Sequence, residues 1–171
     1  MSDKSPRLSL FFSVTAVIVV VLDRLTKLWV KNAIPLHDSW PKTGFFRITH
    51  GENTGAAFGM FQNSRLILSI ISSIGVAVVL YMALQLSRRF TFLKWKTTVL
   101  ALGLILGGTV GNLIDRAFIG HVTDFIKLGP WPDFNVADSS VVVGGILLAL
   151  NLIRASGAEF SDGTNGSAER G

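Results

Sequence analysis

Four long apolar segments, spread along the whole chain, are the feature that most limits how this sequence can fold. They run from about residue 8 to 30, 66 to 86, 97 to 114 and 136 to 153. A helix needs about 20 predominantly apolar residues to cross the hydrocarbon core of a bilayer. Each segment is therefore predicted to be a transmembrane helix.

The composition agrees with a membrane protein. The 171 residues are 49% hydrophobic and only 16% charged, and the mean hydropathy is +0.50. These values exclude a disordered chain and an ordinary soluble domain, and they predict one integral membrane domain over residues 1–171. The chain has no cysteine, which excludes disulfides, thiolate metal sites and a cysteine nucleophile.

The positive charges indicate the orientation in the membrane. The 16 Lys and Arg residues outnumber the 11 Asp and Glu residues, but they flank the apolar segments and form no patch, so we expect no nucleic-acid partner. Cations gather before the first segment and between the second and third, at Lys4, Arg7, Arg88, Arg89, Lys94 and Lys96. The positive-inside rule then predicts that both termini are cytoplasmic.

The two links on the outer side are predicted to be structured. Residues 45–50 are β-prone and precede a turn-rich stretch at 51–55, and a short interfacial helix is expected at 56–61. The loop and short helix at 53–61 are expected to close as a lid. Residues 120–126 are predicted to be extended, and Pro130 and Pro132 to force a non-helical return to the membrane. The fold class is a mainly α membrane protein with four transmembrane helices, a small extracytoplasmic β-sheet and a short interfacial helix. The tail at 155–171 is expected to be mobile.

Polar residues at membrane depth are costly and need an explanation. Asp23 and Lys27 lie four residues apart, the favourable order for an intrahelical ion pair. A self-neutralising pair near the membrane edge, with no direct role in function, explains them equally well. In the third segment Gly103, Gly107 and Gly111 share one helical face, which favours close helix packing.

A second polar group lies at the outer end of the third segment. Asn112 and Arg116 are one turn apart and share a face, so an amide and a guanidinium could together grip peptide carbonyls or a phosphate. Binding of a lipid headgroup by Arg116 is the alternative. Asp115 could simply balance the charge of Arg116.

The third polar group is a pair of acids. Asp124 and Asp138 both fall at the outer membrane boundary, on segments that approach the membrane from the same side. Two carboxyl groups that are close together in a partly dry site do not ionise together easily, so one stays protonated and the other can act as a base toward water. The alternatives are an N-cap role for Asp138 and a water-facing loop position for Asp124.

Other chemistries have less support. His37, His50 and His121 have no spacing that would place two zinc ligands on one helix face, and no nucleotide-binding or serine-nucleophile motif is present. A membrane carrier that uses Asp23, Asp115, Asp124 and Asp138 as an ion path is a rival hypothesis, but it should show an internal repeat, and none is visible. An assembly subunit, whose acids serve only as caps and pairs, is a third.

Taken together, the polar motifs resemble those of the lipoprotein signal peptidases, the type II signal peptidases of bacteria, which are membrane aspartyl peptidases. The resemblance extends over nearly the whole chain between its tails. It rests on five motifs that occur in the family's order: Asp23-x-x-x-Lys27, Asn53-Thr-Gly-Ala-Ala-Phe-Gly59, Gly107-Gly-Thr-Val-Gly-Asn-Leu-Ile-Asp-Arg116, Gly120-His-Val-Thr-Asp-Phe-Ile126 and Phe134-Asn-Val-Ala-Asp138.

The resemblance implies an enzyme that removes the signal peptide from a diacylglyceryl-modified prolipoprotein, just before the lipidated cysteine. It implies a multi-pass protein of the bacterial cytoplasmic (inner) membrane, with its site near the outer face, in contact with membrane lipid, working without a metal or cofactor and as a monomer. Globomycin-type cyclic peptides are the implied inhibitors. The implied catalytic pair is Asp124 and Asp138.

The resemblance also implies roles for the other motif residues. The residues implied to position the substrate or support the acids are Asn53, Asn112, Arg116 and Asn135. The residues implied to give structural support are Asp23, Lys27, Gly108 and Asp115.

Overall fold

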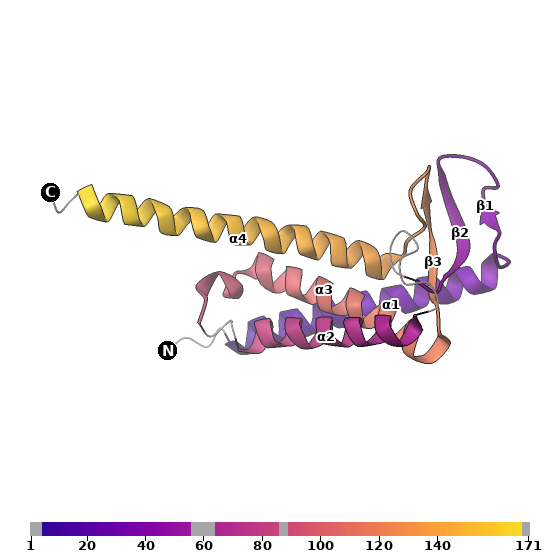
Figure 1. The fold of residues 1–171 in the computed structure, drawn as a ribbon, viewed down its shortest axis with the longest axis horizontal. Coiled ribbons are helices and arrows are strands. Elements are labelled where there is room, and N and C mark those ends of the chain that lie inside the picture. Colours follow the sequence, from indigo (N-terminus) through magenta and orange to yellow (C-terminus); the bar gives the residue numbers. More distant parts are fainter. Residues whose placement is uncertain (1–4, 56–63, 86–88, 169–171) are drawn as a thin grey trace.

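Four helices and one small sheet make up the computed structural model, which describes residues 5–55, 64–85 and 89–168. The helices run side by side and the sheet lies across one end of them (Figure 1). Each helix contains a segment long and apolar enough to cross a membrane, which confirms the predicted four-helix frame. The helices are α1 (Ser5–Ala33), α2 (Arg65–Leu84), α3 (Lys96–Ile114) and α4 (Val136–Ala168).

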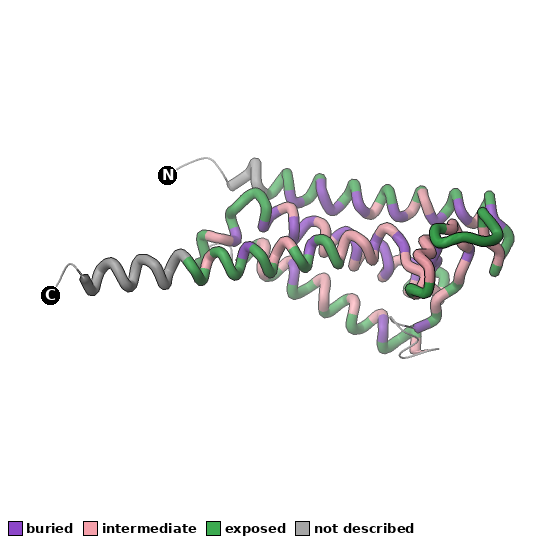
Figure 2. The backbone as a smooth tube through the Cα atoms, turned by 90° about the horizontal axis from the view of Figure 1, so that it is seen from above, coloured by how far each residue is buried: buried purple, intermediate pink, exposed green. Residues whose placement is uncertain are grey.

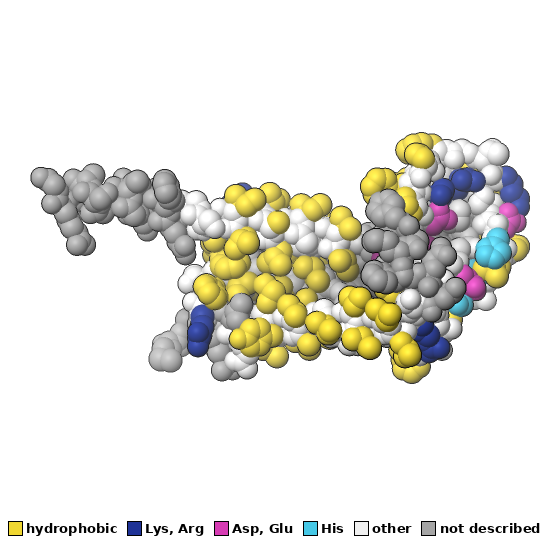
Figure 3. Space-filling view, viewed as in Figure 1, with side chains coloured by type: hydrophobic (Ala, Val, Ile, Leu, Met, Phe, Trp, Pro, Cys, Tyr) yellow, Lys and Arg dark blue, Asp and Glu magenta, His cyan; other side chains and the backbone are white. Residues whose placement is uncertain are grey.

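Helix α3 is the centre of the bundle, because it packs against α1, α2 and α4. Figure 2 shows that the buried residues are concentrated on α3 and on the face of α1 toward it, while many residues of α4 are exposed. Hydrophobic side chains cover the outside of the helices, and charged ones gather at the sheet end (Figure 3). This distribution suits helices surrounded by lipid, where apolar side chains face outward at no cost.

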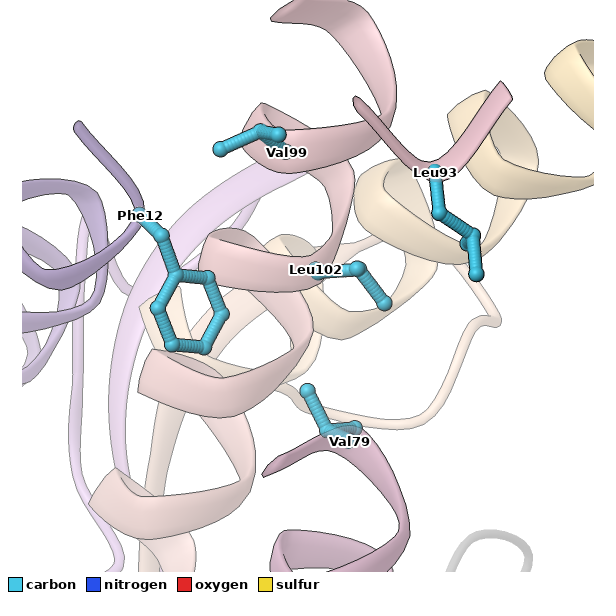
Figure 4. Packing of buried hydrophobic residues seen from close by; sticks show 5 residues of the cluster. All are labelled: Phe12, Val79, Leu93, Val99 and Leu102. Carbon is cyan, nitrogen blue, oxygen red and sulfur yellow. The ribbon is translucent and has the colours of Figure 1, made fainter. Parts of the chain in front are cut away.

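An apolar cluster fixes the end of the bundle away from the sheet. The cluster joins α1, α2 and α3 to a short 3₁₀ turn, η3 (Thr91–Lys94), which links α2 to α3. Its buried members are drawn in Figure 4: Phe12, Val79, Leu93, Val99 and Leu102. With this end held by apolar packing, most of the polar residues predicted to carry function lie at the other end.

Glycines let α3 approach its neighbours closely. A methyl group added at Gly107 would lie 2.7 Å from the carbonyl oxygen of Ala16 in α1, and one added at Gly108 would lie 2.3 Å from the carbonyl oxygen of Ala137 in α4. Gly103 and Gly111 meet α1 in the same way. The packing role predicted for the stripe of Gly103, Gly107 and Gly111 is therefore confirmed, and Gly108 performs it on the opposite side, toward α4.

The sheet is antiparallel, with strands in the order β1 (Ser39–Trp40), β2 (Phe46–Asn53) and β3 (Val122–Leu128). The prediction of a turn at 51–55 was wrong for its first three residues, because β2 continues to Asn53 after a shift in register between Ile48 and Gly51. Main-chain pairing with β3 outweighs the poor strand propensity of glycine and asparagine. The longer strand pairs Asn53 with Val122 and Gly51 with Asp124.

A π-helical turn, η4 (Asp115–Ile119), connects α3 to β3. It ends at Gly120, whose φ of 98° is a left-handed conformation that glycine adopts without strain. At the start of α2, Arg65 donates hydrogen bonds from its guanidinium to the carbonyl oxygens of Arg116 and Ala117. Unpaired carbonyls at a helix end need such donors, so Arg65 ties α2 to the turn that follows α3 at the sheet end.

The remaining predictions for the connecting segments have mixed outcomes. The extended segment predicted at 120–126 corresponds to β3, and the return through Pro130 and Pro132 is non-helical as predicted. Helix α2 ends at Leu84, and α4 continues to Ala168, past the predicted end at 153. The interfacial helix predicted at 56–61 lies outside the described residues, as does the lid predicted at 53–61 beyond its first three residues. Mobility of the tail stays a prediction.

The close approach of α3 and α4 leads to a first prediction. We expect Gly108→Ala to destabilise the fold by about 1–3 kcal/mol, because its new methyl group meets the rigid main chain of α4 at Ala137. Gly145→Ala is the matched control, since nothing lies within 4 Å of a methyl group added there and alanine favours a helix. Thermal unfolding in detergent should give a lower Tm for Gly108→Ala only. Equal Tm values for the two variants would contradict this account of the contact.

Candidate functional site

Asp124 and Asp138 come from different elements and line the same cavity, of about 1140 Å³. Asp124 lies on β3, is only 4% exposed and pairs across the sheet with Gly51 of β2. Asp138 lies in the first turn of α4 and is half-buried. The structure thus brings together the two acids that the sequence predicted to be close.

Amide groups surround the two carboxyl groups. Asn53 donates from Nδ2 to Oδ2 of Asp124 over 2.9 Å, and Asn135 donates from Nδ2 to its Oδ1 over 2.7 Å. Asn112 donates from Nδ2 to Oδ1 of Asp138 over 2.7 Å, and the main-chain N–H of Asn135 donates to its Oδ2 over 3.2 Å. Every carboxylate oxygen of the pair therefore accepts one hydrogen bond, and Asn135 contacts both acids.

The start of α4 explains how Asp138 and Asn135 are held. The main-chain N–H of Asp138 donates to Oδ1 of Asn135 over 2.9 Å, while Asp138 accepts from the main chain of Asn135 in return. This reciprocal pattern is a capping box, with Asn135 as the N-cap and Asp138 three residues later. The alternative prediction of Asp138 as the N-cap was therefore wrong: Asn135 takes that place. The box aims the carboxyl group of Asp138 at the start of its own helix.

The environment of Asp124 favours its protonated form. Burial and, to a lesser degree, the nearby charge of Asp138 together raise the pKa of Asp124 to about 7, against the opposing effect of the hydrogen bonds from Asn53 and Asn135. Removing a carboxyl group from water disfavours its charged form, and a second carboxylate does the same. Asp124 can therefore hold a proton near neutral pH.

Behind the two acids lies a cluster of buried charges. Asp23, Lys27 and Asp115 are each 0% exposed. The Nζ atom of Lys27 is 2.7 Å from Oδ2 of Asp23 and 2.7 Å from Oδ2 of Asp115, and the guanidinium of Arg24 is 2.6 Å from Oδ1 of Asp115. The predicted Asp23–Lys27 pair is confirmed, but at a fully buried position. Asp115, which the sequence suggested could balance Arg116, forms its direct ion pairs with Lys27 and Arg24 of α1, and acts on Arg116 only through the longer-range effect of its charge.

The buried cluster also reaches the candidate site. Asp23 accepts a hydrogen bond at Oδ1 from the main-chain N–H of Ala137 over 3.0 Å, so a side chain of α1 satisfies the first turn of α4. Lys27 donates to Oδ1 of Asn112 over 3.0 Å. Four acids that a carrier would place on one path are instead divided: Asp23 and Asp115 are paired with cations, and Asp124 and Asp138 line the cavity.

Arg116 points into the same cavity. Its guanidinium donates to the carbonyl oxygen of Gly55 over 3.3 Å, and its buried Nε has no hydrogen-bond partner among the described residues. A donor that is buried without a partner is costly. A carbonyl or phosphate oxygen that enters the cavity can satisfy it, so both roles expected for Arg116 stay predictions.

The cavity is lined by both polar and apolar side chains. Its polar part includes Asn53, Asn112 and Arg116, and its apolar wall includes Val141–Val143 of α4. Helix α2 contributes Ser72. Such a mixed lining can hold a polar reacting group beside an apolar chain. No group of three or more His, Asp or Glu residues in the described ranges is arranged to hold a metal ion.

The sequence interpretation missed two residues that organise this region. Arg24 pairs with Asp115, and Arg65 holds the carbonyls of η4. Arg24 had a recognisable signal, because a charge in an apolar helix needs a partner. Arg65 had none, since its acceptors are main-chain atoms that only the folded chain brings to it.

Comparisons with known proteins agree with this architecture. The family model of signal peptidase II (SPase II) matches residues 15–154, which include every site residue named above. A lipoprotein signal peptidase from Dehalococcoides mccartyi is 42% identical over 147 residues, which are 86% of this chain and 91% of that protein. Another from Symbiobacterium thermophilum is 42% identical, covering 82% of this chain and 92% of its own length.

Solved structures give the same result for the fold. A bacterial membrane enzyme solved at 2.3 Å resolution superposes with a TM-score of 0.74 and 32% identity, covering 84% of this chain and 87% of that one. A second, solved at 1.9 Å, gives a TM-score of 0.69 and 33% identity, with coverages of 81% and 90%. With its four membrane-spanning helices and these full-length relatives, the protein belongs to the signal peptidase II family, the lipoprotein signal peptidases, which are bacterial membrane peptidases.

Proposed function

We propose that this protein is an aspartyl endopeptidase that removes the signal peptide from diacylglyceryl-modified prolipoproteins, cleaving just before the lipidated cysteine. One observation carries the proposal. Asp124 and Asp138 line one cavity at the boundary between the polar and apolar parts of the molecule, and Asn135 is hydrogen-bonded to both. Two linked carboxyl groups of this kind can share one proton, as an acid and a base require.

The reaction needs only the two aspartates and a water molecule. The ionised aspartate takes a proton from water, whose oxygen forms a bond to the scissile carbonyl carbon, while the protonated aspartate gives its proton to the carbonyl oxygen. The resulting tetrahedral diol collapses when the C–N bond breaks. The amine then takes a proton from one aspartate, and the other recovers a proton from a diol hydroxyl. The dyad ends as it began, and one water molecule is consumed.

The neighbouring side chains have supporting roles in this proposal. Asn53, Asn112 and Asn135 hold the carboxyl groups in place by the hydrogen bonds described above. Arg116, which has an unpartnered buried N–H, donates to a substrate carbonyl and stabilises the charge that develops there. The residues proposed to give structural support are Asp23, Lys27, Gly108 and Asp115.

The shape of the cavity suits a substrate that arrives within the membrane. The peptide bond would lie at the polar end, and the signal peptide and acyl chains would follow the apolar wall along α4. Such a substrate enters sideways from lipid, without passing through water. A globomycin-type cyclic peptide would occupy the same cavity and act as an inhibitor. We propose that one copy of the chain is sufficient, since both acids come from it.

The orientation in the membrane follows from the charges. Helix α1 begins, and helix α4 ends, on the side of the bundle away from the sheet (Figure 1). The cations Arg89, Lys94 and Lys96 lie in or beside the link from α2 to α3, on that same side. We propose that this side is cytoplasmic and that the sheet and the dyad lie at the outer face of the cytoplasmic membrane.

The proposal predicts that each aspartate is required for cleavage. Asp124→Asn and Asp138→Asn should each lower kcat by on the order of 10²–10⁴-fold, because each removes one partner of the proton transfer. Asp38→Asn, a like substitution in an exposed Asp38–Lys42 ion pair near the sheet, should leave kcat unchanged. The measurement is a gel-shift assay in lipid vesicles with a diacylglyceryl-modified prolipoprotein. Full activity of either dyad variant would refute the mechanism.

The proposal also predicts how activity depends on pH. The reactive dyad carries one proton, and Asp124 keeps its proton up to a pKa of about 7. As the pH rises through about 7, Asp124 ionises, the dyad carries two negative charges and no acid remains, so kcat/KM should fall. The measurement is the pH profile of kcat/KM, and Asp38→Asn should reproduce the wild-type profile. An activity that stays constant to pH 9 would contradict the assignment.

A further inference from the structure

Asn112 serves Asp138 in only one orientation of its amide. Its Nδ2 donates to Oδ1 of Asp138 over 2.7 Å. Turned by half a rotation, the amide would place its oxygen against a carboxylate oxygen, and two acceptors do not form a hydrogen bond. Asn112 is only 7% exposed, and a buried polar atom that loses its hydrogen-bond partner is costly. The reactive geometry of Asp138 therefore depends on what holds the other end of this amide.

Lys27 holds that other end. Its Nζ donates to Oδ1 of Asn112 over 3.0 Å, and Nδ2 of Asn135 lies 3.2 Å from the same oxygen. An ammonium group has three donors and no acceptor, so only the oxygen of Asn112 can face it. Asn135 in turn donates to Asp124 over 2.7 Å. A chain of contacts thus runs from Lys27 through two amides to both acids.

The charge of Lys27 is balanced where it lies. Its Nζ is 2.7 Å from Asp23 and 2.7 Å from Asp115, and Asp115 also pairs with Arg24 over 2.6 Å. Two cations and two acids give this cluster no net charge. Lys27 reaches the dyad through the hydrogen bond that it donates to Asn112, and its positive charge also lowers the pKa of Asp124.

We propose that Lys27 is a positioning residue for catalysis, which locks the amide of Asn112 and, through Asn112 and Asn135, sets the carboxyl groups of both aspartates. This inference rests on the proposed function of the dyad and extends the structural role expected for the Asp23–Lys27 pair. Catalytic groups that are misplaced by about 1 Å lose on the order of 100-fold in rate. Substrate binding, which depends on the walls of the cavity, should change little.

The experiment compares Lys27→Met with Arg24→Met in the full chain reconstituted in lipid vesicles. Each variant removes one cation from the same cluster, a fully buried one at Lys27 and one with a 22% exposed side chain at Arg24, and only Lys27→Met loses the donor to Asn112. A charge-balanced variant, Asp23→Asn with Lys27→Met, keeps an oxygen for the main chain of Ala137 and protects against loss of folding. Values of kcat and KM are measured with a diacylglyceryl-modified prolipoprotein.

We expect both Lys27 variants to lose on the order of 10- to 100-fold in kcat with KM within about twofold of wild type, and Arg24→Met to keep kcat within about threefold. Adding Lys27→Met to Asn112→Ala should cause no further loss, because the two residues act in one chain. Four results would each overturn the inference. They are a loss of kcat in Arg24→Met equal to that in Lys27→Met, a wild-type kcat in the charge-balanced variant, additive losses of kcat when Lys27→Met is combined with Asn112→Ala, and failure of the charge-balanced variant to fold.

The same assay separates this inference from the proposed function. If wild type does not cleave the prolipoprotein, or if Asp124→Asn retains full rate, the proposed function fails. If wild type cleaves, both dyad variants are inactive and the Lys27 variants turn over normally, only the role of Lys27 fails.

Discussion

The ammonium group of Lys27 is fully buried, and much of the structure depends on how its charge is satisfied. A charge inside an apolar bundle is tolerated only when it is paired and hydrogen-bonded, and removal of one partner of a buried pair costs about 3–5 kcal/mol. Lys27 meets this condition with one acceptor from its own helix α1 and two from α3. Asp23, its partner on α1, then binds the main chain of α4 at Ala137. Three helices are thereby held in one arrangement by one set of polar contacts.

Such a network forms only if the helices come close enough, and the glycines of α3 make this possible. Gly111 leaves room for Asp23, since an added methyl group would lie 2.8 Å from its carboxylate oxygen, and Gly108 leaves room for the first turn of α4. Small residues at contacts between membrane helices permit this approach of backbones. Packing and polar contacts are therefore not separate contributions here. Loss of a glycine would separate the groups that satisfy the buried charges.

The sequence predicted well those features that depend on local pattern. Apolar length identified the four helices, and the order Asp23–Lys27 identified an ion pair. The predicted closeness of Asp124 and Asp138 is confirmed, since both line one cavity, while their catalytic role stays a prediction. Features that depend on distant main-chain atoms were not accessible. The residues Gly51–Asn53 have poor strand propensity and were assigned to a turn, yet pairing with β3 keeps them in β2. Asp115 was matched to its neighbour Arg116, although its partners lie on another helix. The capping box had a recognisable signal in the sequence, because Asn135 and Asp138 have its spacing, although the sequence interpretation considered Asp138 as the N-cap.

The hydrogen bonds to the dyad explain why two acids can be held together in a dry site without being neutralised by a cation in direct contact. Each of the four carboxylate oxygens accepts one hydrogen bond from an amide, and a carboxylate oxygen has a second lone pair. One lone pair therefore fixes each oxygen, and the other remains available for a proton or a water molecule. The donors are fixed in turn by β2, α3 and the first turn of α4. In the proposed reaction little reorganisation would be needed when charge moves, since the dipoles that hold the acids are already oriented. Fixed amides thus supply, inside the membrane protein, the stabilisation that water supplies to a carboxylate at the surface.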